Sequence, residues 1–189
     1  YYFIYRERTE KQAVDNPPIL PDSPGVSFIV PCHNEGGNVR DTIEALLDQD
    51  YPDFEVLAVN DASGDETGEV LDEIAAADDR VRVIHFESNQ GKAMGLRAGA
   101  IAANNEILVC IDGDAMLDRH ATRWLVWQMH QNPRVAAVTG NPRVRNSTTL
   151  LGKIQAGEFS SIIGLIKRAQ RIYGRVFTVA GVVAAFRRS

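Results

Sequence analysis

The sequence has only two cysteines, Cys32 and Cys110, among its 189 residues. Each lies in or at the end of an apolar run, which is typical of a buried thiol and unlike the framework of a disulfide-rich protein. No spacing of His and Cys resembles a zinc site. No G-x-G-x-x-G segment follows the first predicted strand, and no apolar run reaches the roughly 18 to 20 residues that cross a bilayer. These absences argue against a disulfide scaffold, a zinc protein and a dinucleotide-dependent oxidoreductase.

Acidic residues are scarce at one end of the chain, although the net charge is −5. Residues 143–189 carry nine Lys or Arg and a single acidic residue, Glu158, which gives a balance of +8. Residues 1–142 carry 11 basic and 24 acidic residues, a balance of −13. A basic end on an acidic body suggests contact with an anion, either a nucleotide phosphate or lipid head groups. An uneven distribution of surface charge without a binding role is the alternative.

Residues 1–25 are interpreted as a juxtamembrane segment and linker. The chain opens on the aromatic run YYFIY, followed by the charged run RER, a pattern typical of the interfacial end of a membrane helix. An ordinary chain terminus is the alternative. Residues 6–25 are polar and contain four prolines, which indicates a linker. The globular domain is therefore predicted to span residues 26–189.

Strands and helices alternate through this domain. Strands are predicted over residues 26–30, 54–59, 81–86, 106–111 and 135–139, and helices over residues 37–49, 65–77, 91–103 and 118–131. Pro31 is expected to end the first strand, and Ser63 or Asp65 to cap the second helix. The alternation predicts an α/β fold with a mostly parallel sheet flanked by helices on both faces. Such sheets bind ligands outside the carboxyl ends of their strands.

The pattern of apolar and charged residues changes after Gly140. Apolar residues recur at three- and four-residue steps across residues 150–173, and basic residues occupy much of the remainder. This pattern predicts an amphipathic basic helix, suited either to the edge of a core or to a membrane surface. A strand-like apolar run, residues 176–186, follows it.

Polar side chains follow three of the predicted strands. Asn34 and Glu35 follow the first strand, Asp61 the second, and Asp112 and Asp114 the fourth. Carboxylates are hard oxygen ligands that suit Mg²⁺ or Mn²⁺, and such a metal bridges a protein to a diphosphate. Taken singly, each residue has an ordinary explanation as a turn or a helix cap. Together they direct attention to one edge of the sheet.

Four segments resemble, in the same order, the motifs of family 2 glycosyltransferases. VPCHNE at residues 30–35 is similar to the motif V-P-x-Y-N-E, and NDAS at residues 60–63 is similar to D-D-x-S. GKAMGLRAG at residues 91–99 is similar to K-x-x-A-x-N-x-G, and IDGDA at residues 111–115 is similar to D-x-D. Each motif is weak alone, but the series covers nearly all of residues 26–189. Residues 155–159 and 178–188 further resemble the processive bacterial polysaccharide synthases, above all those that make poly-β-1,6-N-acetylglucosamine.

The resemblance implies a GT-A nucleotide-sugar-binding fold with specific site residues. The positions that match the donor-binding motifs are Pro31, His33, Glu35, Asp61, Lys92 and Asp112. Among them, Asp61 would accept a hydrogen bond from the uracil N3–H, and Lys92 would approach the diphosphate. Asp112 would hold the ribose or the metal, Mg²⁺ or Mn²⁺, and Asp114 the metal itself. His33 stands where the family usually has Tyr, and Gly181 falls on the acceptor side.

The activity that the resemblance implies is inverting transfer of a sugar, N-acetylglucosamine in the nearest subgroup, from a UDP-sugar donor to a growing glycan acceptor. It also implies the bacterial inner membrane surface with the catalytic domain in the cytoplasm, an accessory membrane subunit, and no nucleic-acid partner. In these synthases the general base belongs to an E-D or T-E-D motif after the F-R-R segment, and a Q-x-x-R-W motif comes later. Neither occurs before Ser189, so donor-binding machinery without the complete catalytic centre is expected.

Two other functions stay open. One is a non-processive UDP-sugar transferase acting on a lipid or another acceptor. The other is a non-catalytic nucleotide-binding module. Titration with nucleotides, with and without Mn²⁺, distinguishes the donor site of a transferase from a non-catalytic nucleotide-binding module.

Overall fold

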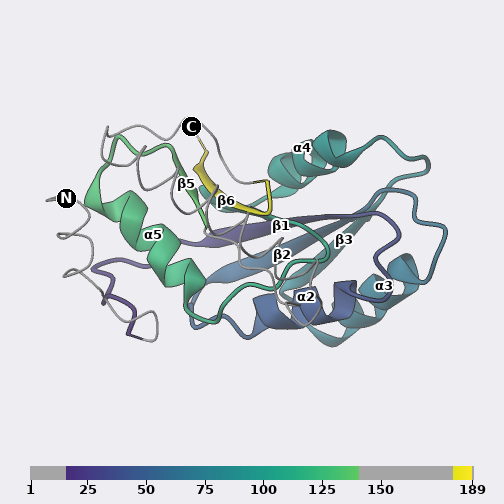
Figure 1. Ribbon diagram of the computed structural model, residues 1–189, viewed down its shortest axis with the longest axis horizontal. Coiled ribbons are helices and arrows are strands. Elements are labelled where there is room, and N and C mark those ends of the chain that lie inside the picture. The colour runs from purple at the N-terminus through teal and green to yellow at the C-terminus, as the bar shows by residue number, and fades with distance from the viewer. Residues whose placement is uncertain (1–15, 141–180, 189) are drawn as a thin grey trace, which may run out of the picture.

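Four parallel strands form the centre of the structure (Figure 1), a computed structural model that describes residues 16–140 and 181–188. The six-stranded sheet has the order β3-β2-β1-β4-β6-β5. Strand β6 lies antiparallel between β4 and β5, and the other neighbours pair in parallel. The prediction of a mostly parallel sheet is therefore confirmed. The strands are β1 (Val26–Cys32), β2 (Phe54–Asn60), β3 (Val81–His85), β4 (Ile107–Ile111), β5 (Ala137–Thr139) and β6 (Val183–Arg187).

Helices cover both faces of this sheet, as predicted (Figure 1). Helices α2 (Val39–Leu47), α3 (Thr67–Ala77) and α5 (Ala121–Gln131) contribute to the larger apolar cluster on one face. Helix α4 (Lys92–Ala102) covers a smaller cluster on the other face. Successive strand residues point to opposite faces, so a central strand must be apolar almost throughout. Strand β1 meets this demand, because Phe28 packs into the larger cluster and Ile29 into the smaller one.

Helix α4 lies close to the sheet because two glycines face it. A Cβ atom on Gly99 would lie 2.3 Å from Cγ2 of Ile29, and one on Gly95 would lie 3.1 Å from Cβ of Pro31. The small side chains of this segment thus permit close packing of α4 on the sheet. The close contact places Lys92, the first residue of the helix, beside the carboxyl ends of the strands.

Strand β1 continues through Pro31 to Cys32, so the prediction that Pro31 ends the strand is wrong. The Cys32 carbonyl accepts a hydrogen bond from the Asp61 N–H at 2.9 Å, so the backbone groups of Cys32 face β2. Backbone groups alternate in direction along a strand, and the nitrogen of Pro31 therefore faces the β4 side. Pairing with β4 has already ended there, at Ile29 and Cys110. The missing N–H of proline consequently costs the sheet no hydrogen bond.

Several predicted boundaries also shift by one to three residues. Helix α3 begins at Thr67 with Glu66 as its N-cap, so neither Ser63 nor Asp65 is the N-cap residue that was predicted. The Asp65 carboxylate still accepts a hydrogen bond from the Thr67 N–H at 3.0 Å. Helix α5 begins at Ala121 instead of residue 118, because residues 119 and 120 form a turn before it.

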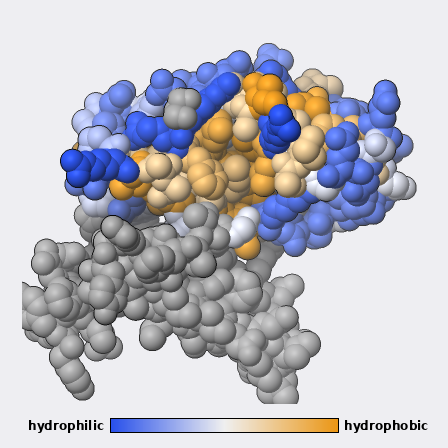
Figure 2. All heavy atoms as spheres, turned by 90° about the horizontal axis from the view of Figure 1, so that it is seen from above, coloured by the Kyte–Doolittle hydropathy of each residue, from blue (hydrophilic) through white to orange (hydrophobic). Residues whose placement is uncertain are grey.

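The side of the molecule that carries α4 has an apolar strip across its middle, with hydrophilic side chains around it (Figure 2). Met94, Ile101 and Phe186 are exposed hydrophobic side chains on α4 and β6.

Within residues 16–140 and 181–188, no helix is both long enough and apolar enough to cross a bilayer. The predicted juxtamembrane residues 1–15 and the predicted basic helix, residues 150–173, lie outside the described residues.

Candidate functional site

The carboxyl ends of β1, β2 and β4 meet at a pocket of about 270 Å³. The structure brings all the residues predicted for donor and metal binding to this one place, because parallel strands direct their carboxyl ends to the same edge. Gly181, predicted on the acceptor side, is exposed and does not line the pocket. The lining residues are Pro31, Cys32, His33, Glu35, Asp61, Lys92, Asp112, Gly113 and Asp114.

Asp61 is held in the pocket by two backbone donors. Asp61 is only 3% exposed. One of its carboxylate oxygens accepts a hydrogen bond from the N–H of Gln90 and the other from the N–H of Gly91, each at 2.7 Å. Gly91 has a φ of 85°, a conformation that glycine adopts at little cost. Each carboxylate oxygen has a second lone pair, so Asp61 can still accept a hydrogen bond from a ligand.

The loops after β1 and β2 are joined by reciprocal hydrogen bonds. The Asn34 N–H donates to Ser63 Oγ at 3.0 Å, and the Gly64 N–H donates to Asn34 Oδ1 at 2.8 Å. Asn34 and Ala62 have φ values of 56° and 53°, in the left-handed region. Asparagine tolerates this region better than alanine does. Ala62 therefore holds backbone strain directly beside Asp61.

The imidazole of His33 connects the segment after β2, which holds Asp61, to the β3–α4 loop, which holds Asn89. Its Nδ1 lies 2.8 Å from the Asp61 carbonyl oxygen, which makes Nδ1 the donor. Its Nε2 can then accept a hydrogen bond from the Asn89 side-chain amide, 3.1 Å away. Asn89 was missed by the sequence analysis, because a polar residue in the β3–α4 loop has no periodic signal. Its place two residues before the glycine of the G-K segment is the only clue in the sequence.

The Asp112-Gly113-Asp114 turn lies tightly against β1. A Cβ atom on Gly113 would lie 3.3 Å from both Glu35 Cγ and the Pro31 carbonyl oxygen. The Gly113 carbonyl accepts a hydrogen bond from the buried Thr42 hydroxyl of α2 at 2.9 Å. Glycine at this position lets the turn approach the strand closely, and Thr42 fixes its orientation.

Glu35 begins the turn that leads into α2. Its N–H donates to Thr67 Oγ1 at 2.8 Å, and its carbonyl accepts hydrogen bonds from the N–H groups of Asn38 and Val39, both at 2.8 Å. The backbone of Glu35 is therefore fixed by α2 and α3 together. Its side chain lines the pocket beside Gly113.

Two carboxylates, Asp112 and Asp114, and the ammonium group of Lys92 also line the pocket. Asp114 is exposed, and Asp112 forms an ion pair with Lys92. Within residues 16–140 and 181–188, no three His, Cys, Asp or Glu side chains are grouped to hold a metal ion. Mg²⁺ commonly takes one or two carboxylates and fills its remaining positions with water and phosphate oxygens. The donor set of Asp112 and Asp114 therefore fits a divalent cation that is shared with a bound diphosphate.

Both cysteines are free thiols with raised pKa values. Burial, and then the charge of Glu35, raises the pKa of Cys32 to about 12. Burial raises the pKa of Cys110 to about 11, although the Lys92 charge opposes the shift. Both thiols are therefore neutral at neutral pH, and Cys32 contributes to the pocket as an apolar wall.

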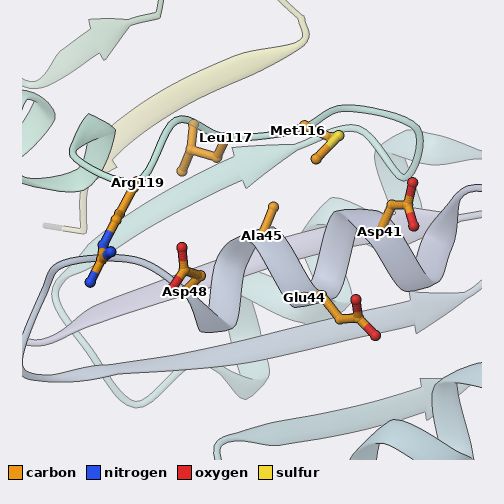
Figure 3. Close-up of a pocket in the computed structure, with 7 residues that line it drawn as sticks. All are labelled: Asp41, Glu44, Ala45, Asp48, Met116, Leu117 and Arg119. Atoms are coloured by element: carbon orange, nitrogen blue, oxygen red, sulfur yellow. The ribbon is translucent and has the colours of Figure 1, made fainter. Parts of the chain in front are cut away.

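A larger pocket, of about 420 Å³, lies between α2 and residues 116–119 (Figure 3). Asp41 and Glu44 line it from α2, Asp48 lines it from the position directly after the helix, and Arg119 lies at the same end of the pocket as Asp48. The three carboxylates follow the length of the helix and do not converge on one point. None of the predicted site residues belongs to this pocket, so its greater size does not make it the better candidate.

The sequence from residue 27 to residue 189 matches the profile of "Glycosyl transferase family 2". The chain belongs to glycosyl transferase family 2. The family 2 domain is 37% identical, over 198 aligned residues, to the poly-β-1,6-N-acetyl-D-glucosamine synthase of Staphylococcus epidermidis. It is 34% identical over 189 residues to the synthase of the same name from Staphylococcus aureus (strain MSSA476). Each alignment covers 100% of this chain and 46% of the relative, so the chain spans about half the length of the curated relatives it matches.

Solved structures share the fold of this family 2 domain. The mannosyltransferase PcManGT of Pyrobaculum calidifontis, in complex with GDP-Man and Mn²⁺, matches 99% of this chain and 51% of its own chain with a TM-score of 0.72 and 26% identity. TarS 1–349 of S. aureus, in complex with UDP-GlcNAc, matches 67% of this chain and 36% of its own with a TM-score of 0.56 and 21% identity. The predicted family and the predicted GT-A glycosyltransferase fold are both confirmed.

Proposed function

We propose that this family 2 domain binds a UDP-sugar in the pocket at the strand ends, as the donor-binding part of a membrane synthase. The synthase would transfer N-acetylglucosamine, with inversion, to a growing glycan. One observation carries the proposal: the pocket joins Asp61, Lys92 and the Asp112–Asp114 pair, which come from separate parts of the sequence. The names of the staphylococcal relatives support the sugar, and the UDP-GlcNAc complex of TarS supports the nucleotide.

The base of the nucleotide is assigned to the end of the pocket that holds Asp61. A carboxylate with free lone pairs favours uracil, whose N3 carries a hydrogen, over cytosine, whose N3 does not. His33, which lies against the Asp61 carbonyl, offers its ring beside the base. Glu35 also lines the pocket, with its side chain beside Gly113, and is assigned to the base and ribose.

The diphosphate is assigned to the end of the pocket that holds Lys92, Asp112 and Asp114. Lys92 is the first residue of α4, and the free N–H groups of a helix N-terminus favour anions. Asp112 and Asp114 would hold Mg²⁺ or Mn²⁺. Such a metal, when bound, neutralises negative charge that develops on the leaving diphosphate. The protein residues themselves bind and orient the donor.

Calorimetric titration with UDP, with and without Mn²⁺, tests the proposal. Asp114→Asn is expected to weaken Mn²⁺-dependent UDP binding by about tenfold or more, because it removes a charged metal ligand, and to leave metal-free binding nearly unchanged. Asp79→Asn removes an exposed carboxylate outside the pocket and serves as the matched control. An equal loss in both conditions would indicate a folding defect and remove Asp114 from the metal site.

GDP-mannose is the second candidate donor. PcManGT, which holds GDP-Man, matches 99% of this chain with a TM-score of 0.72. Titration with GDP beside UDP distinguishes the two donors. Tighter binding of GDP would replace the UDP-sugar by a GDP-sugar and would also remove the proposed role of Asp61 toward uracil.

We further propose that the whole protein acts at the inner membrane surface of a bacterium, with this domain in the cytoplasm and with an accessory membrane subunit as a partner. The balance of +8 over residues 143–189 supports contact with anionic lipid. The growing glycan is the proposed acceptor, and Gly181 is assigned to its side of the domain. The N–H of Asp112 donates to the carbonyl of Val182 at 3.2 Å, which places this segment next to the donor pocket.

A further inference from the structure

Lys92 and Asp112 join two separate elements across the pocket. Lys92 is the first residue of α4, and its ammonium group contacts Oδ1 of Asp112, which directly follows β4. The Lys92 side chain is 51% exposed and that of Asp112 is 26% exposed. Both residues line the pocket, so a ligand that enters it can reach both partners of the ion pair.

The first turn of a helix is an unfavourable place for a cation. Its unpaired N–H groups carry partial positive charge, which repels an ammonium group and attracts an anion. Helix α4 has no acidic residue in its first turn, and none of its described side chains caps its N-terminus with a hydrogen bond. The Asp61 carboxylate accepts a hydrogen bond from the N–H of Gly91 at this end of the helix, and Asp112 is the carboxylate that pairs directly with the ammonium group.

Asp112 cannot serve Lys92 and a metal ion equally well. A divalent cation coordinated by Asp112 and Asp114 would place two positive charges beside the ammonium group, and like charges at such distances repel. A bound diphosphate brings negative charge to the same end of the pocket. The ammonium group can then keep an anionic partner while Asp112 becomes available to the metal.

We propose that Lys92 is an internal counter-ion that occupies Asp112 in the empty pocket and exchanges it for the donor's diphosphate when the metal ion binds. This inference rests on the proposed function, because it needs a diphosphate and a divalent cation in the pocket. It predicts that the metal alone binds weakly and that nucleotide and metal strengthen each other's binding. By linkage, each ligand must raise the affinity of the other by the same factor.

The test compares Mn²⁺ binding, measured by electron paramagnetic resonance, with and without UDP. Lys92→Gln is expected to bind Mn²⁺ alone about threefold tighter, because it removes the competing ammonium group from a partly exposed ion pair. In the presence of Mn²⁺, the same variant is expected to bind UDP about tenfold weaker, because a charged hydrogen bond to phosphate is lost. These two effects have opposite signs, which a general folding defect would not produce.

Arg97→Gln is the matched control, because Arg97 is an exposed basic residue on the same helix. It removes the same charge at a distance from the pocket, and both affinities are expected to change less than about twofold. Equal effects of the two variants would show that overall charge is responsible and would overturn the exchange. Unchanged or weaker binding of Mn²⁺ alone to Lys92→Gln would also overturn it.

The wild-type protein separates a failure of this inference from a failure of the proposed function. Wild-type binding of UDP with Mn²⁺, together with an unchanged Mn²⁺ affinity in Lys92→Gln, would refute the exchange and leave the donor site in place. A wild-type protein that binds neither UDP nor Mn²⁺ would refute the proposed function and the exchange with it.

Discussion

The carboxylate of Asp61 accepts a hydrogen bond at 2.7 Å from the backbone N–H of Gly91, the residue directly before Lys92. Asp61 follows β2, and Gly91 is the N-cap of α4. The residue assigned to the uracil base therefore also fixes the start of the helix that carries the residue assigned to the diphosphate. Through this one carboxylate, the two ends of the proposed donor site have a fixed relative position.

Asp61→Asn is expected to lower both stability and nucleotide selectivity. An amide at this position has one acceptor oxygen, and its NH₂ group would face an N–H donor, which costs about 1–3 kcal/mol of unfolding free energy. The preference for UDP over CDP should fall in calorimetry, because the amide can accept from one base and donate to the other. An unchanged ratio would remove Asp61 from the base site. An unchanged free energy of unfolding in urea would contradict a stabilising role for the hydrogen bonds that Asp61 accepts from Gln90 and Gly91.

Ala62→Gly is expected to stabilise the protein by up to about 1 kcal/mol, because glycine adopts the φ of 53° without the strain that a Cβ atom causes. Urea unfolding measures the change. Ala98→Gly, within α4, is the control and should destabilise by about the same amount, because glycine is a poor helix former. A loss of stability in Ala62→Gly would show that the left-handed conformation carries no relievable strain.

Gly99→Ala is expected to destabilise the domain by about 1–3 kcal/mol, because its Cβ atom would lie 2.3 Å from Ile29 Cγ2 and force α4 away from the sheet. Gly37→Ala is the control, since a Cβ atom there would have nothing within 4 Å. Thermal unfolding of the two variants gives the comparison. If both variants melt alike, the close packing of α4 on β1 is not what requires glycine.

The two thiols are expected to react slowly with iodoacetamide at pH 8 in the folded protein. The pKa of Cys32 is raised to about 12 and that of Cys110 to about 11, so almost no thiolate is present. Labelling should become fast in urea, where the pKa returns to its ordinary value of 9.0. Because the unfolded thiols ionise first, the free energy of unfolding should fall as pH rises above about 9. Rapid labelling of Cys32 at pH 8 without denaturant would contradict its burial.

The purified protein is expected to float with liposomes that contain anionic lipid. Basic residues near such a surface contribute roughly 1 kcal/mol each, and residues 143–189 carry a balance of +8. Binding should weaken in high salt, since exposed charges are screened within about 10 Å at 0.1 M. Vesicles of neutral lipid are the control. Protein that stays soluble with anionic vesicles at low salt would show that the basic helix predicted over residues 150–173 belongs to the core instead.

The sequence alone predicted the elements that have strong local signals. The central strands are largely apolar runs buried on both faces, and α2 has buried apolar residues at helical spacing, so the alternation of strands and helices and the mostly parallel sheet followed. Helix α4 has a weaker signal, because the residues that it buries are Gly95 and Gly99. The meeting of the polar residues after β1, β2 and β4 at one edge followed from the same reasoning, whereas Lys92 was indicated only by the resemblance to the family 2 motifs. Local signals failed at Pro31, where the outcome depends on how far β4 extends alongside β1.

What only the tertiary structure decided is how the site residues contact one another. Nothing near Asp61 in the sequence shows that its carboxylate binds the N–H groups of Gln90 and Gly91, about 30 residues away. The Asn89 contact with His33 and the ion pair of Lys92 with Asp112 were likewise hidden. Periodicity and motifs report which face or strand end a residue occupies, because these depend on local backbone geometry. Partner choice depends on the register of the strands and on how closely α4 packs, and these are set only when the whole sheet assembles.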